Sequence, residues 1–200
     1  PPAVVHGDFR MGNLLVRPDL DPSSGISAVL DWELAHLGNP VEDLGWFCVR
    51  AWRFGSPHRA GGVGSVADLL ASYNSATVEI GSGFGPPVSV EELAWWELYG
   101  TVRWGIICLV QADAHLTGAT KSVELAAIGR RTAETEFDIL GLLAELDADI
   151  GALGHGDGPV TEKTTPQGLF GRPTNTELLD AVAEFLRSDV MSATSGRVRF

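Results

Sequence analysis

The chain has 200 residues, 44% of them hydrophobic, which suffices for one domain with a proper core and a small additional segment. It carries 14 Lys and Arg against 26 Asp and Glu, a net charge of -12, and this balance disfavours nucleic acid as a partner because phosphate binding needs a cationic surface. The longest apolar run, Trp104–Val110, is far shorter than the roughly 20 residues that cross a bilayer, so we expect no membrane span.

The first elements along the chain form a predicted β-hairpin. After the short apolar lead Ala3–Val5 and a loop, Leu14–Val16 has the composition of a strand. A stretch dense in turn formers, Pro18–Gly25, separates it from a second apolar run, Ile26–Leu30. These features predict two antiparallel strands joined by a turn.

The expected register of this hairpin brings two polar side chains together. If Arg17 faces Ile26 across the turn, antiparallel pairing places Asn13, at the start of one strand, beside Asp31, at the end of the other. An amide and a carboxylate would then be neighbours.

Most of the following sequence is predicted to be helical. Asn39 and Pro40 suit the start of a helix that runs to about Phe54, and Ser89 with Glu92 forms a capping box. The helices expected after the first one span Val66–Ser75, Ser89 to about Leu116, and Val123–Leu146. The fold class is therefore α+β and mostly α.

The composition changes near residue 151. Gly151–Pro173 is rich in Gly, Pro and Thr, as flexible connectors are. Thr174–Glu177 is a second capping box, followed by an amphipathic helix that ends near Val190. We expect a domain over residues 1–150, a linker over 151–173, and over 174–200 a helix that either opens a truncated second domain or docks on the first.

The two cysteines and the start of the chain indicate the cellular compartment and the extent of the parent protein. Cys48 and Cys108 lie in apolar stretches, which predicts buried free thiols and a reducing, cytoplasmic location. The chain starts at Pro1 and its first motif follows at once, so we expect a piece of a longer protein. The six tryptophans are expected mostly in the core, with Trp32 the best placed to line a substrate pocket.

Four acidic or amide side chains fit phosphoryl transfer, which requires a group to orient the attacking hydroxyl and divalent metal to neutralise charge. Asp8 lies in a loop before a strand, where it can reach a substrate hydroxyl. Asn13 and Asp31 offer the hard oxygen ligands that Mg²⁺ prefers, and Glu33 is placed for a second ion or a water-mediated contact. The structural alternatives are a turn cap for Asp8 and a solvated carboxylate for Glu33.

The motifs HGDFRMGNLLV (His6–Val16), VLDWELAHLGNP (Val29–Pro40) and EDLGWF (Glu42–Phe47) carry a family resemblance. The sequence resembles the C-terminal lobe of the aminoglycoside phosphotransferase and choline kinase-like family, whose members share the protein kinase-like fold. It is most similar to bacterial phosphotransferase family proteins and to the kinase-like domain fused to some acyl-CoA dehydrogenases.

The resemblance implies a role for each motif residue. Asp8 would be the catalytic base or hydroxyl orienter, and Asn13 and Asp31 would be magnesium ligands in an ATP-dependent reaction. His6 would brace the catalytic-loop hairpin, and Asp43 would hold the backbone of the loop or serve as an ordinary helix-dipole partner.

The resemblance also implies an N-terminal lobe with a nucleotide-binding lysine on a strand. The two lysines of this chain, Lys121 and Lys163, precede a helix and lie in the predicted linker, so neither matches it. We expect that lobe in the parent protein and poor activity from this chain alone.

These features predict an ATP- and Mg-dependent phosphotransferase lobe that acts on a hydroxyl of a small molecule. The resemblance favours a hydroxyacyl-CoA or hydroxy acid over an aminoglycoside. The alternative is a non-catalytic kinase-like module that binds a protein partner through an apolar face. A hydrolase with Asp8 as covalent nucleophile is a distant third possibility.

Overall fold

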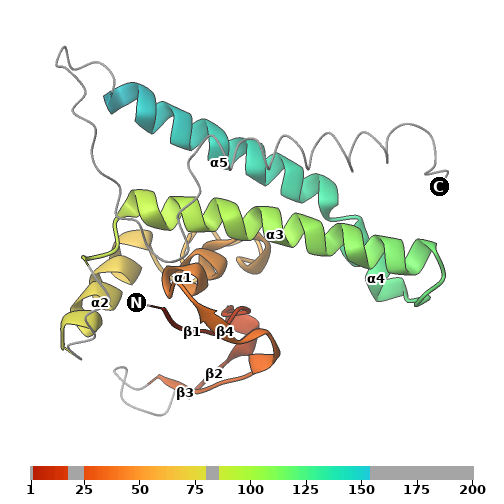
Figure 1. The fold of residues 1–200 in the computed structure, drawn as a ribbon, viewed down its shortest axis with the longest axis horizontal. Coiled ribbons are helices and arrows are strands. Elements are labelled where there is room, and N and C mark those ends of the chain that lie inside the picture. The colour runs from red at the N-terminus through yellow and green to blue at the C-terminus, as the bar shows by residue number, and fades with distance from the viewer. Residues whose placement is uncertain (1, 18–24, 80–85, 154–200) are drawn as a thin grey trace. The chain divides into compact units, whose positions relative to one another are not determined.

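The structure, a computed structural model, describes residues 2–17, 25–79 and 86–153 (Figure 1). The chain divides into two compact units, Pro1–Pro159 and Val160–Phe200, and every described element belongs to the first unit. The predicted helix over 174–200 lies outside the described residues, as does the predicted linker apart from residues 151–153.

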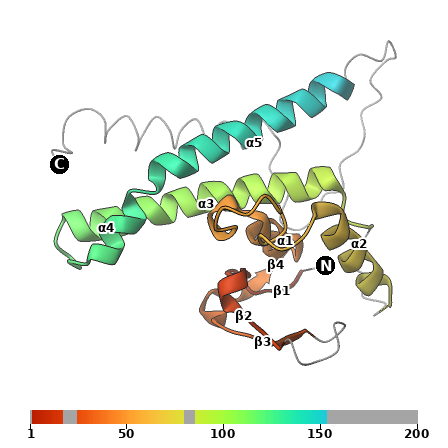
Figure 2. The same cartoon turned by 180° about the vertical axis from the view of Figure 1, so that it is seen from behind.

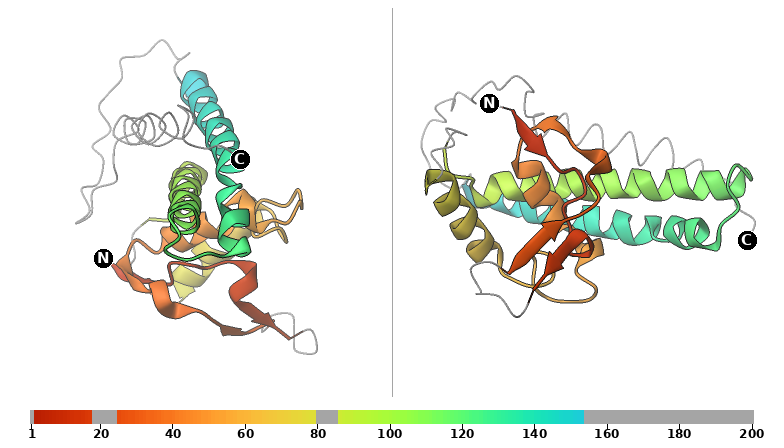
Figure 3. Two further views of the ribbon diagram at one scale, coloured as in Figure 1. Left: turned by 90° about the vertical axis from the view of Figure 1, so that its right-hand side faces the viewer. Right: turned by 90° about the horizontal axis from the view of Figure 1, so that it is seen from below.

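Two small antiparallel sheets lie at the N-terminal end of the unit. Strand β1 (Ala3–Val5) pairs with β4 (His36–Gly38), and β2 (Leu14–Val16) pairs with β3 (Ile26–Val29). The β1–β4 pair brings together the two ends of the segment from Ala3 to Gly38. These ends are about thirty residues apart in sequence and run side by side beneath the helices (Figure 3).

The register of β2 and β3 differs from the predicted one. Leu14 pairs with Val29, but Val16 pairs with Ile26, so Ser27 is an extra residue that forms a bulge. Asn13 therefore lies opposite Leu30, whose amide donates a 2.8 Å hydrogen bond to the Asn13 carbonyl. Asp31 is one residue further along, because the Leu14–Val29 pairing continues to Asn13 and Leu30 and not to Asp31.

Short 3₁₀ segments prolong the loops around the sheets. One covers Met11–Asn13, a second covers Trp32–Leu34, and a third covers Arg50–Trp52. Helix α1 (Val41–Cys48) ends before Phe54, where the prediction placed its end, because Val49 adopts an extended ψ of 132° that breaks the helix.

Four further helices follow α1 in the described part of the chain. They are α2 (Val66–Glu79), α3 (Val90–Leu116), α4 (Val123–Gly129) and α5 (Thr132–Leu153). Among them, α4 and α5 pack on α3. Ser89 caps α3 by accepting a hydrogen bond from the Glu92 amide, as the capping box predicts. None of the described helices combines the length and apolar character that a membrane crossing needs.

The single helix predicted over Val123–Leu146 is two helices in the structure. The chain breaks between Gly129 and Thr132, where α4 lies against α3 so closely that a Cβ on Gly129 would sit 2.6 Å from the Ala112 side chain. Tertiary packing thus uses a weak helix former as the break point. Helix α5 then continues to Leu153, three residues into the predicted linker.

Helix α3 is the centre of the unit, with α1 and the strands on one side and α5 on the other (Figures 1 and 2). Gly45 permits the close crossing of α1 and α3, because a Cβ there would meet the Trp96 backbone at 2.5 Å. Two clusters of buried side chains in the described core lie beside α1: Val41, Leu44, Cys48, Leu70 and Leu93 form one, and Trp46, Val49 and Trp52 form the other. Both cysteines are buried and free, as predicted.

Candidate active site

Three side chains hold the carboxylate of Asp8. The Nε1 of Trp46, on α1, donates to Oδ1 at 2.8 Å, and the Nδ2 of Asn13 donates to Oδ2 at 2.8 Å. The Nε of Arg10 lies 3.2 and 3.1 Å from the two oxygens. The Asp8 side chain is 18% exposed, so its carboxylate is fixed in direction and still reachable from solvent.

Asn13 is buried and its amide orientation is set by Asp8. Its Nδ2 donates both to the Asp8 carbonyl and to the Asp8 carboxylate, each at 2.8 Å. The Oδ1 atom accepts no hydrogen bond from the described part of the chain. The fixed amide therefore leaves an oxygen free to act as a ligand.

Asp43 anchors the loop that carries Asp8. Its two carboxylate oxygens accept hydrogen bonds from the backbone amides of His6 and Gly7, at 2.7 and 2.9 Å. Gly7 has a φ of 84°, and a Cβ there would meet the Leu34 carbonyl at 2.6 Å, so only glycine fits this turn. Helix α1 thus supplies both Asp43 and Trp46 to the loop.

His6 connects the HGDFRMGNLLV motif, in which it lies, to the VLDWELAHLGNP motif. Its Nδ1 accepts from the Asp8 amide at 3.1 Å, so the proton lies on Nε2, which faces the Leu30 carbonyl at 2.8 Å. The ring also lies 4.6 Å from the Trp32 ring. With both ring nitrogens engaged, the geometry is that of a brace and not of a proton-transfer group.

Asp31 has an unusual backbone beside this brace. Its φ of 68° and ψ of 55° are left-handed, a conformation that is uncommon outside glycine and often marks functional positions. The Asp31 and Glu33 carboxylates are exposed and accept no hydrogen bond from residues that the structure describes. In the part of the chain that the structure describes, no hydrogen bond joins either of them to the Asp8 or Asn13 side chain.

The side-chain oxygens of Asn13 and Asp31 are of the type that magnesium binds. Asn13 and Asp31 offer one amide oxygen and one carboxylate that accept no hydrogen bond from the described residues. Mg²⁺ takes few protein ligands because it keeps waters or phosphate oxygens. Over residues 2–17, 25–79 and 86–153 no group of three or more His, Cys, Asp or Glu side chains is arranged around a common point. A closed all-protein metal cage is therefore not what these residues form.

Sequence reasoning missed Arg10 and Trp46. Arg10 stands in the motif itself, two residues after Asp8, and its guanidinium lies 5.4 Å from the centre of the Trp52 ring. Trp46 is distant in sequence, and the only signal for it was its place on the inner face of a helix whose Asp43 was already a candidate. Both form hydrogen bonds to the Asp8 carboxylate.

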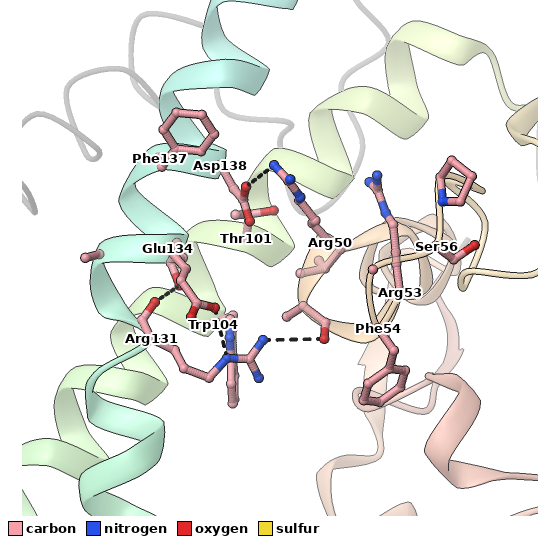
Figure 4. A pocket seen from close by; sticks show the side chains of 16 residues that line it. Arg50, Arg53, Phe54, Ser56, Thr101, Trp104, Arg131, Glu134, Phe137 and Asp138 are labelled. Atoms are coloured by element: carbon pink, nitrogen blue, oxygen red, sulfur yellow. Dashed lines mark hydrogen bonds and ion pairs between the residues drawn. The ribbon is translucent and has the colours of Figure 1, made fainter.

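A cavity of about 950 Å³ lies between the Val49–Pro57 segment and α5 (Figure 4). Trp104, on α3, lines it, whereas Trp32, the tryptophan predicted to line a substrate pocket, does not. The Trp104 ring is 4.8 Å from that of Trp52, which in turn is 5.2 Å from that of Trp46. A row of three tilted or edge-on rings therefore links the cavity wall to the residue that holds Asp8.

A buried ionic cluster holds Arg53, which lines the cavity. Glu97 is buried on α3, and its carboxylate binds Arg53 at 2.6 Å and Arg59 at 2.7 Å. Desolvation raises the pKa of Glu97, while the two arginines act in the opposite direction. Burial also raises the pKa of the Cys48 thiol to about 12, so that thiol is inert.

Known proteins are similar to parts of this chain. Residues 1–76 match the phosphotransferase enzyme family. Mouse acyl-CoA dehydrogenase family member 10 is 46% identical over 46 residues, which are 23% of this chain and 4% of that protein. Human acyl-CoA dehydrogenase family member 11 is 33% identical over 78 residues, 35% of this chain and 10% of that protein. The matches thus cover a small part of these relatives.

One solved structure is similar over a longer stretch. It is that of a candidate aminoglycoside phosphotransferase from Ralstonia eutropha, with a TM-score of 0.52 and 27% identity, and the match covers 67% of this chain and 40% of that one. The fold is therefore kinase-like, mostly helical with small sheets.

Proposed function

Because residues 1–76 belong to the phosphotransferase enzyme family, we propose that this chain is the catalytic lobe of a kinase-like enzyme that transfers phosphate from ATP to a hydroxyl of a small molecule. The observation that carries the proposal is the Asp8 carboxylate, which Trp46, Asn13 and Arg10 hold at the surface of the loop. A carboxylate fixed in this way can orient an attacking hydroxyl.

Asp8 acts on the acceptor in this proposal. The acceptor hydroxyl donates its hydrogen to an Asp8 oxygen, its oxygen forms a bond to the γ-phosphorus, and the bond from that phosphorus to the ADP oxygen breaks. The hydroxyl proton passes to Asp8. Arg10, His6 and Asp43 keep the carboxylate and its loop in place, so they are positioning residues.

Asn13 and Asp31 would hold magnesium, with Glu33 near enough in sequence for a second ion or a water. When bound, the metal supplies positive charge that neutralises the transferring phosphoryl group. The support from this chain is that Asn13 is held by its amide nitrogen, which leaves the oxygen as the ligand atom. The left-handed Asp31 sits one residue after the Leu30–Asn13 backbone bond.

The acceptor is proposed to be a hydroxyacyl-CoA or a hydroxy acid. Acyl-CoA dehydrogenase family members 10 and 11 are among the relatives that match part of this chain, and this similarity supports an acceptor from acyl-CoA chemistry. An aminoglycoside is the weaker candidate, although the similar solved structure carries that description.

A non-catalytic binding module is the second candidate, and one observation favours it. The strands expose several large apolar side chains, among them Val4, Val16, Ile26 and Leu37, each more than half exposed. Such a surface suits contact with another protein or with a further lobe of the same protein.

The deciding experiment uses the natural protein that contains this chain and follows ADP production with hydroxyacyl-CoA, a hydroxy acid and kanamycin as acceptors. Asp8→Asn is expected to abolish transfer without unfolding the protein, because the amide keeps the shape of the side chain but not its basicity. Asp147→Asn, an exposed position on α5, is the matched control. Transfer that survives Asp8→Asn would remove Asp8 from the proposed role, and no transfer to any acceptor would favour the binding module.

A further inference from the structure

Arginine side chains dominate the polar lining of the 950 Å³ cavity. Arg50 and Arg53 come from the segment after α1, and Arg131 comes from the start of α5 on the opposite wall (Figure 4). The acidic residues of the lining are Glu134 and Asp138. Arginine thus exceeds acid in this cavity, in a chain whose overall charge is -12.

The two carboxylates of the lining are already paired. Asp138 binds Nη1 of Arg50 at 2.9 Å, and Glu134 lies 3.3 Å from Nε of Arg131. Among the described residues, the other nitrogens of Arg50 have no partner, and Arg131 has only a long 3.5 Å contact from Nη2 to the Ala51 carbonyl. Both guanidinium groups therefore keep donors for a further anion.

Arg53 has a different role. Its Nη2 is bound to buried Glu97 at 2.6 Å and to the Cys48 carbonyl at 2.7 Å, and its side chain is largely buried. It forms a fixed part of the wall, and Arg50 and Arg131 are the adaptable cations.

Aromatic rings provide the apolar part of the cavity. The Arg131 guanidinium lies 5.6 Å from the centre of the Trp104 ring, and Phe137, on α5, also lines the cavity. Phe54 lines the rim with its side chain 83% exposed and a backbone φ of 49°. A bulky residue rarely adopts a left-handed conformation, so the backbone here presents an exposed ring at a cost in free energy.

From these features we infer that the cavity is the acceptor site, and that it binds a molecule with an apolar body and an anionic group, which Arg50 and Arg131 recognise. The inference rests on the proposed function and narrows its acceptor class. A carboxylate and a phosphate both fit the arginine fork. A polycationic acceptor gains nothing from these donors, because it offers them no anionic group.

The test is calorimetric titration of the full chain, without nucleotide, with coenzyme A, with a hydroxy fatty acid, and with kanamycin. We expect at least one of the two anions to bind, more weakly at high salt, and kanamycin not to bind. Binding of coenzyme A alone identifies phosphate as the recognised group, and binding of the hydroxy acid alone identifies carboxylate. The inference is overturned if neither anion binds better than kanamycin.

Four variants locate the site. Arg50→Ala and Arg131→Ala are each expected to weaken binding of the anion about tenfold or more, since each removes a charge-assisted contact. Phe54→Ala should also weaken it, and this exposed side chain can be removed without a loss of folding. The matched control is Arg130→Ala, which removes the same charge one residue away from Arg131 and outside the lining. Equal weakening by Arg130→Ala and Arg131→Ala would contradict the inference.

The two proposals can fail separately. Asp8→Asn should bind the anion normally while it transfers no phosphate. If the cavity variants bind normally and the natural protein still transfers phosphate, the cavity is not the acceptor site. If they lose binding but the natural protein never transfers phosphate, the cavity binds an anion and the proposed reaction is wrong.

Discussion

The indole nitrogen of Trp46 donates a 2.8 Å hydrogen bond to a carboxylate oxygen of Asp8, a residue 38 positions earlier in the chain. Trp46 is 2% exposed, and its ring also packs beneath the Arg103 guanidinium at 4.8 Å. This contact makes α1 a direct support of the candidate catalytic side chain.

Replacing this support tests whether the direction of the Asp8 carboxylate matters. Trp46→Phe keeps an aromatic ring but removes the donor, so we expect kcat to fall about tenfold or more with little change in KM, as for loss of one charge-assisted hydrogen bond. The measurement is steady-state kinetics of the natural protein. A rise in KM at constant kcat would instead show that Trp46 affects acceptor binding through Trp52 and the cavity.

The buried carboxylate of Glu97 should be among the strongest single contributors to stability. Glu97→Ala leaves Arg53 and Arg59 without their shared partner, and loss of one member of a buried ionic group typically costs about 3–5 kcal/mol. Because Arg59 is one-third exposed, we expect a value at the lower end. Urea unfolding followed by tryptophan fluorescence measures it.

The control for Glu97 lies in the same network. Glu145 also binds Arg59, at 3.1 Å, but its side chain is 61% exposed. Glu145→Gln should therefore change the midpoint of unfolding very little. Equal effects of the two substitutions would show that burial does not determine the strength of these ion pairs.

The left-handed backbone of Phe54 is expected to lower the stability of the folded chain. Phe54→Gly removes the conformational penalty and is expected to raise the free energy of unfolding by up to about 1 kcal/mol, partly offset by the entropy of glycine. Phe54→Ala keeps a Cβ and should show no such gain. Differential scanning calorimetry of both variants provides the comparison, and a loss of stability in the glycine variant would mean that the ring contributes more than the strain costs.

His36 predicts a pH dependence of stability. Its hydrogen bond to the Leu34 carbonyl, followed by its contact with Glu42, raises its pKa above the ordinary 6.5, against the opposing effect of burial. The raised pKa stabilises the folded state, fully below about pH 6.5, and this contribution is lost as the pH rises through the folded pKa.

His36→Gln should remove that part of the pH profile. The measurement is the urea midpoint between pH 5 and 8 for the wild-type chain and the variant, with the difference largest at pH 5. His58→Gln is the control, because this exposed histidine lies outside the contact with Glu42. A profile that is the same for wild type and His36→Gln would contradict the assignment.

Features that depend on near neighbours in the sequence were predictable. The capping of α3 by Ser89 requires only the amide three residues later, and the approach of Asn13 to Asp8 occurs within one loop. Burial of both cysteines followed from their apolar surroundings. The bulge at Ser27 and the break after Gly129 were not predictable, because each depends on which strand or helix lies opposite.

The sequence by itself determined the motifs, their spacing around Asp8, and the mainly helical class, since turn chemistry, capping and periodicity are set within a few residues. Only the tertiary structure decided that Trp46 holds Asp8 and that Arg50 faces Arg131 across a cavity. The physical reason is that such contacts join segments tens of residues apart, and their geometry is fixed by the close packing of α1 and α5 on α3.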